Sequence, residues 1–160
     1  MTVANADNAD SPMRSALGML FAIVCAAALG LAAGAVWMVL AVYAQHGGRV
    51  PDTAWLALPF GLALGLVMRA WIAPRGWLAA LLAALATLLA AAYFAVLLAA
   101  IRIGGALGIG LIGALRSAGA DLLSQAARLA LQPADYGWFL AGAALAAITA
   151  WLAWRPRKRL

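Results

Sequence analysis

Polar residues follow a regular spacing in only one stretch of this apolar chain. They are Ser117, Asp121, Ser124, Gln125, Arg128 and Gln132. Successive intervals of 4, 3, 1, 3 and 4 residues place them on one face of an α-helix, within an arc of about 100°. Leucines occupy the opposite side, at positions 115, 122 and 129. This stretch is therefore the candidate binding element of the chain.

Charged groups in this stretch could contact a polar headgroup or a partner protein. Asp121 and Arg128 are seven positions apart and share a helix face, with Gln125 between them and Arg116 just before them. We take Arg116, Asp121, Gln125 and Arg128 as candidate partner or lipid contacts. The alternative is a solvated stripe with no binding role, since exposed charges need no specific partner.

The residues needed for catalysis are missing from the sequence. There is no glutamate, and His46 and Cys25 are the only residues of their types. We find no zinc-protease motif, no phosphate-binding Gly–Lys motif and no nucleophile beside a base. We therefore predict no enzyme activity, no cofactor and no metal site.

The composition predicts an integral membrane protein. The chain has 160 residues, of which 68% are hydrophobic and 10% charged, so its polar residues cannot cover a soluble core. The net charge of +6 lies beside hydrophobic segments, where membrane topology and lipid headgroups explain it. We therefore predict a lipid bilayer environment and no nucleic-acid partner.

Four segments are expected to cross the bilayer, because each crossing needs roughly 20 apolar residues. We place the spans at residues 16–44, 54–72, 77–101 and 136–154, which together form one membrane domain over residues 16–154. Residues 1–15 are expected to be a disordered tail. Gly30 with Gly34, and Gly61 with Gly65, form small-xxx-small pairs that allow close helix contact, although a chain so rich in alanine and glycine contains such pairs by chance.

The amphipathic segment lies between the third and fourth spans, at residues 104–132. Its narrow polar face predicts that it lies flat at the membrane–water boundary or re-enters the membrane. Glycines crowd its first part, and we take Gly104, Gly108, Gly110 and Gly113 as candidate hinge or packing positions. The alternative is a connector that only joins two spans.

The distribution of basic residues predicts that both termini are cytoplasmic. This orientation places seven basic residues inside and four outside, as the positive-inside rule favours. The cytoplasmic tail at residues 155–160 holds four of the seven, Arg155, Arg157, Lys158 and Arg159, as topology or headgroup anchors.

From these features we expect an all-α, multi-pass protein of the cell inner membrane that acts as a non-enzymatic accessory, assembly or scaffold subunit. Its amphipathic helix would contact lipid, a membrane-protein partner or a second copy of the chain. The absence of ionisable residues from the span centres argues against a proton-coupled pump. The alternative function is a small oligomeric transporter, channel or lipid-translocating protein.

Overall fold

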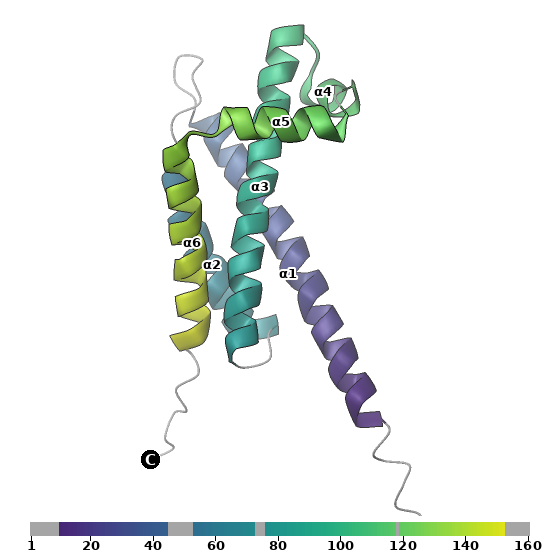
Figure 1. Ribbon diagram of the computed structural model, residues 1–160, viewed down its shortest axis with the longest axis vertical. Helices are drawn as coiled ribbons and strands as arrows, with labels where there is room; N and C mark the ends of the chain where they lie inside the picture. The colour runs from purple at the N-terminus through teal and green to yellow at the C-terminus, as the bar shows by residue number, and fades with distance from the viewer. Residues whose placement is uncertain (1–9, 45–52, 73–75, 118, 153–160) are drawn as a thin grey trace, which may run out of the picture.

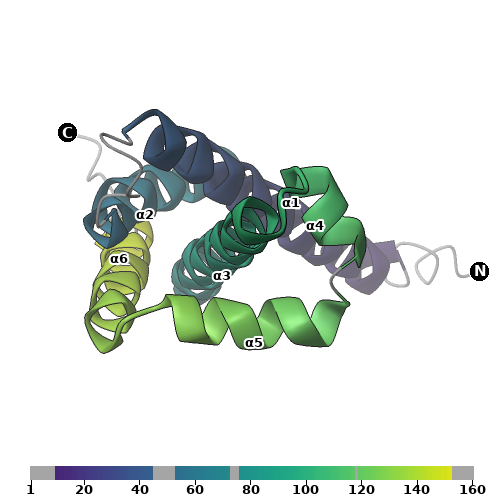
Figure 2. The same ribbon diagram turned by 90° about the horizontal axis from the view of Figure 1, so that it is seen from above.

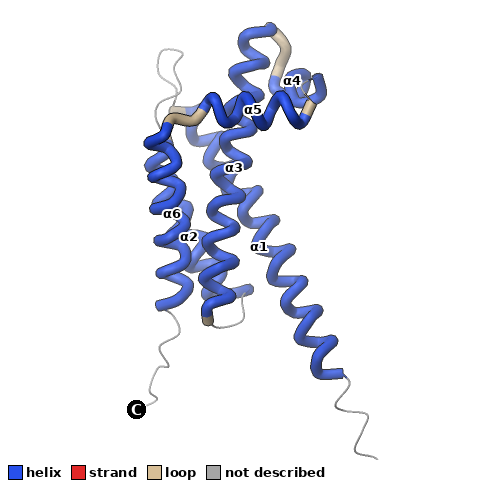
Figure 3. The backbone as a smooth tube through the Cα atoms, viewed as in Figure 1, coloured by secondary structure: helices blue, strands red, loops and turns tan. Residues whose placement is uncertain are grey.

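All regular secondary structure in the described part of the chain is helical. The computed structural model describes residues 10–44, 53–72, 76–117 and 119–152, and all regular structure in these ranges is helix (Figure 3). The predicted all-α fold class is confirmed. The basic tail at 155–160 lies outside the described residues.

Four helices run along the length of the molecule, and α3 (Trp77–Leu107) lies among the other three (Figures 1 and 2). Helix α1 (Asp10–Tyr43) packs against one side of α3, and α6 (Pro133–Leu152) packs against another. Helix α2 (Ala57–Val67) pairs with α6. A short 3₁₀ turn, η1 (Ala54–Leu56), precedes α2, and a π-helical turn, η2 (Met68–Ile72), follows it.

Two of these helices are long and apolar enough to cross a membrane by length and composition, over Ala16–Tyr43 and Trp77–Leu107. The apolar helix at Ala54–Ala70 is shorter. Helix α6 has 20 residues, but its first turns contain polar or weakly apolar residues, including Asp135 and Tyr136. The number of membrane crossings therefore remains a prediction.

Helix α1 begins earlier than the sequence predicted. Residues 10–15 were expected in a disordered tail, but they form the first turns of α1. Pro12 is compatible with a helix start at Asp10, because the N–H that proline lacks has no helical partner in the first turn. The prediction of disorder was wrong for these residues, and residues 1–9 lie outside the described part.

Glycines bring the backbones of α1 and α3 together. A Cβ added at Gly30 would lie 2.6 Å from the carbonyl oxygen of Ala86, and one at Gly34 would lie 2.6 Å from that of Ala90. These distances are below any normal carbon–oxygen contact, so a side chain larger than hydrogen cannot fit at either position. The Gly30–Gly34 pair is therefore a true helix-packing motif.

The pair Gly61 and Gly65 plays the same role between α2 and α6. A Cβ at Gly61 would collide with the backbone carbonyl of Gly142, and one at Gly142 would collide with that of Ala57. A Cβ at Gly65 would lie 2.7 Å from the carbonyl oxygen of Ala146 and would also meet Thr149. The two helices thus approach through glycine on both sides, which explains why α6 pairs with a helix so distant in the sequence.

An aromatic cluster joins α1, α2, α3 and α6, the four helices that run along the molecule. The Trp37 ring of α1 is fully buried and stacks on Phe94 of α3 at 4.7 Å and on Phe60 of α2 at 5.6 Å between ring centroids. Phe139 of α6 meets it edge-on at 5.8 Å. The indole N–H donates a hydrogen bond to the Thr53 carbonyl oxygen at 3.2 Å, so its one polar group is satisfied.

Candidate functional site

The glycine-rich run ends α3 and starts a new helix. Helix α3 continues six residues past the predicted end at 101, to Leu107. Gly108 then adopts a left-handed conformation, with φ of +66°, and its N–H and that of Ile109 both donate to the Gly104 carbonyl oxygen. This is the glycine-dependent ending that many helices use. Gly108 is therefore the turning point of the run.

The other three glycines predicted as hinge or packing positions do not lie at this turn or do not end a helix. Gly104 is buried within α3, and a Cβ there would lie 2.6 Å from the carbonyl oxygen of Ile109, so Gly104 is a packing position. The Gly110 carbonyl accepts the N–H of Ala114 at 3.0 Å, at the start of α4 (Leu111–Ser117). Gly113 lies within α4.

The amphipathic segment is not a single helix. Residues 104–132 comprise the end of α3, all of α4, and α5 (Ala120–Ala130), for which Gly119 is the N-terminal cap. Arg116 is therefore on α4, whereas Asp121, Gln125 and Arg128 share α5. All four are exposed. Asp121 also has an interaction partner in the structure.

Helix α5 lies across α3 rather than beside it (Figures 1 and 2). It packs through small residues: Ala127 is buried against Ala95 and Ala99 of α3, with Ala126 and Leu131 at the edges of the contact. Asp121, Gln125 and Arg128 of the polar stripe stay exposed, as do the leucines at positions 122 and 129, and Leu129 is 88% exposed.

A sharp corner joins α5 to α6 and fixes their directions. Leu131 is extended, and Pro133 is the first residue of α6, three residues before the predicted start at 136. Proline suits this first position because the N–H it lacks has no helical partner there. The Gln132 N–H donates to Asp135 Oδ2 at 2.7 Å, and the Asp135 N–H donates to the Gln132 carbonyl oxygen at 3.0 Å. The first bond is one half of a capping box, in which the side chain at the third helical position accepts from the N-cap N–H, and the second is a backbone turn.

We expect the Asp135→Ala variant to loosen this corner. The change removes the acceptor for the Gln132 N–H and a negative charge at the start of α6, at a cost of about 1 kcal/mol. Proteolysis of the detergent-solubilised chain should then cut faster between α5 and α6. Asp135→Asn, which keeps an acceptor oxygen, is the control, and equal cleavage rates for all three proteins would contradict the prediction.

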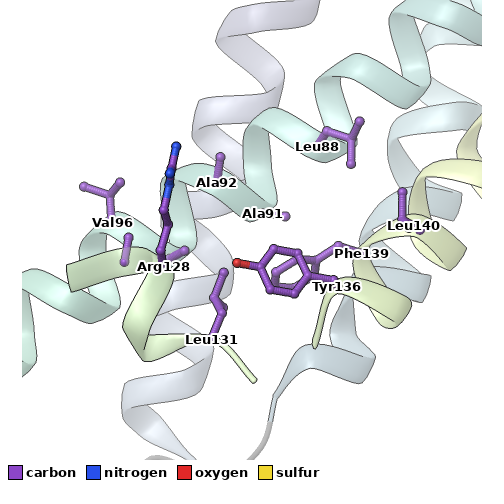
Figure 4. Close-up of a pocket in the computed structure, with 11 residues that line it drawn as sticks. Leu88, Ala91, Ala92, Val96, Arg128, Leu131, Tyr136, Phe139 and Leu140 are labelled. Carbon is purple, nitrogen blue, oxygen red and sulfur yellow. The ribbon is translucent and has the colours of Figure 1, made fainter. Parts of the chain in front are cut away.

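A cavity of about 430 Å³ lies between α3, α5 and α6 (Figure 4). Its walls are mostly apolar, and its lining is formed by Leu88, Ala91, Ala92, Ala95, Val96, Ala127, Arg128, Leu131, Tyr136, Phe139 and Leu140. Arg128 is the only charged residue among them. Figure 4 shows the Tyr136 hydroxyl pointing toward the C-terminal end of α5, where Arg128 lies and Leu131 follows the helix. The cavity is therefore an apolar space with its polar groups near α5.

Sequence reasoning identified Arg128 but missed the cavity. The other lining residues are alanines, leucines and aromatics, which look the same in the sequence whether they face lipid, a neighbouring helix or an empty space. No described group of three or more His, Cys, Asp or Glu side chains could hold a metal ion.

Comparison of the chain with known protein families, curated proteins and solved structures finds no match. Its function is therefore inferred from its own residues and geometry.

Proposed function

We propose that this chain is a multi-pass protein of the cell inner membrane that crosses the bilayer four times, through α1, α2 with its flanking turns, α3 and α6. The apolar lengths of α1 and α3 support two of the crossings. Helix α6, with 20 residues, is about 30 Å long, which matches the hydrocarbon thickness. Both termini lie in the cytoplasm in this arrangement, because basic residues are concentrated on that side.

The contact between α5 and α3 supports a position of α5 at the outer boundary. Ala95 and Ala99 lie 18 and 22 residues after Trp77, the first residue of α3. At 1.5 Å per residue this is about 27–33 Å along the helix, one hydrocarbon thickness from a tryptophan that suits the inner boundary. Helix α5 then lies flat rather than re-entering the membrane.

The end of α3 and the whole of α4 extend past α5 (Figure 1). They expose the apolar residues on which the proposed function rests. Leu107 and Ile112 are 65% and 68% exposed, and Leu111 and Leu115 are exposed beside them. We call these four residues the outer cap. In the proposed arrangement the outer cap lies beyond the hydrocarbon, where acyl chains do not cover it. Exposed apolar patches of this kind are typical of protein interaction sites.

The chain therefore acts as a non-enzymatic accessory, assembly or scaffold subunit that binds a membrane-protein partner through the outer cap and the neighbouring face of α5. The partner is another membrane protein or a second copy of the chain. Exposed polar groups on α5, such as Gln125, would supply the polar rim of this interface, and the outer cap its apolar centre.

The test is affinity purification of the full chain from its own membrane in mild detergent, followed by mass spectrometry. We expect a membrane protein to co-purify with the wild type, or a dimer to form, and Leu107→Ala/Ile112→Ala to reduce that association at least tenfold. The matched control is Leu152→Ala, an exposed leucine at the other end of the molecule. A monodisperse monomer without partners, or association unchanged in the double variant, would overturn the proposal.

A further inference from the structure

We infer that the cavity beneath α5 holds one acyl chain of a phospholipid whose anionic headgroup binds Arg128. The inference rests on the proposed membrane placement of α5. It adds a ligand at a surface separate from the outer cap.

The cavity has the size and chemistry of a site for an apolar chain. Its volume of about 430 Å³ lies within the range of about 300–1,000 Å³ that is common for ligand sites. Its α3 wall runs from Leu88 to Val96, eight steps of 1.5 Å or about 12 Å along the helix. This wall descends from α5 toward the middle of the proposed bilayer, in the direction that an acyl chain takes.

The side of the cavity is open to the surroundings of the bundle. Leu140 of α6 is 63% exposed, and Leu88 and Ala92 of α3 are also exposed, although all three line the cavity. A lipid can therefore enter sideways from the bilayer without any movement of the helices. A water-soluble ligand would find almost no polar groups along these walls.

Charge complementarity selects the headgroup. Arg128 is the only cation of the lining, and it lies on α5 (Figure 4), at the level where lipid phosphates lie in the proposed arrangement. A guanidinium can bind a phosphate through two parallel hydrogen bonds, and the Tyr136 hydroxyl lies at the same end of the cavity. No carboxylate lines the cavity to attract the ammonium of a zwitterionic lipid. The site therefore prefers a headgroup with net negative charge.

The inference is tested by native mass spectrometry of the purified full chain, titrated with phosphatidylglycerol and with phosphatidylcholine of the same acyl chains. We expect phosphatidylglycerol to bind about tenfold more tightly, and Arg128→Ala to remove that preference. Arg128→Lys, which keeps the charge, should retain part of it. Ala92→Phe should weaken binding of both lipids, because the ring fills the cavity from an exposed position.

Two matched variants control for charge and for bulk. Arg69→Ala removes an exposed arginine elsewhere, and Ala28→Phe adds a ring at an exposed position on α1; both should bind lipid as the wild type does. Thermal unfolding followed by circular dichroism identifies any variant that fails to fold. Binding unchanged in Arg128→Ala, or unchanged in a folded Ala92→Phe, would overturn the inference.

Failure of this inference and failure of the proposed function give different results. If partner co-purification depends on the outer cap but phosphatidylglycerol binds no better than phosphatidylcholine, the proposed function stands and the lipid site is wrong. If Ala92→Phe abolishes partner association and leaves lipid binding intact, a partner helix occupies the cavity and the lipid site is again wrong.

Discussion

The Trp37→Ala variant should be the least stable single variant of this protein, losing about 3–5 kcal/mol of unfolding free energy. The indole is fully buried and contacts aromatic rings from α2, α3 and α6. Its removal leaves a cavity at the point where the four long helices meet and also removes the hydrogen bond to the Thr53 carbonyl oxygen. Unfolding by sodium dodecyl sulfate in mixed micelles, followed by circular dichroism, measures the loss.

Two further variants separate the causes. Trp37→Phe keeps an aromatic ring but lacks the N–H donor, so we expect a smaller loss, of which about 1 kcal/mol comes from the hydrogen bond. Trp77→Ala removes a tryptophan that is 64% exposed and should change stability little. If Trp37→Ala and Trp77→Ala unfolded at the same denaturant concentration, the aromatic cluster would not be the core of the fold.

The Gly61→Ala variant should weaken the pairing of α2 and α6 by about 1–3 kcal/mol, the usual cost of overpacking. The added methyl group would collide with the backbone carbonyl of Gly142, which cannot rotate away as a side chain can. In most helices the same substitution stabilises, because alanine has a higher helix propensity than glycine. Whether Gly61→Ala lowers or raises the free energy of unfolding is therefore the informative result.

Gly137→Ala on α6 is the matched control. An added Cβ at Gly137 has no neighbouring atom within 4 Å, so this variant should be neutral or up to about 1 kcal/mol more stable. Both variants can be measured in the same micelles. Stabilisation by Gly61→Ala equal to that by Gly137→Ala would show that the backbones of α2 and α6 do not touch.

The sequence predicts where the helices of this chain lie better than which helices pack against each other. Apolar runs and turn residues located each long helix, but the pairs Gly30–Gly34 and Gly61–Gly65 did not identify their partners. Many alanines and glycines have the same spacing, and only the long-range fold places Gly61 opposite Gly142. A local pattern can indicate a surface for close packing, but it does not predict which helix packs there.

Helix ends were less predictable for a related reason. Several glycines between 104 and 113 could have ended α3, and the sequence does not show that Gly108 ends it, with the returning chain packed on Gly104. The starts of α1 and α6 follow local rules, with prolines at or near the first turn, yet both begin earlier than predicted. Of the candidate contacts, the spacing correctly grouped Asp121, Gln125 and Arg128 on one helix. The cavity depends on three helices at once and has no local signal.

The pairing of α2 with α6 sets an order of events during synthesis. Ribosomes make the N-terminal part of a chain first, so α1 and α3 can associate while α6 is still being translated. The glycine face of α2 stays uncovered until this last helix is made. Chains interrupted before α6 should therefore be degraded faster than the full chain, because the glycine face of α2 has no partner in them.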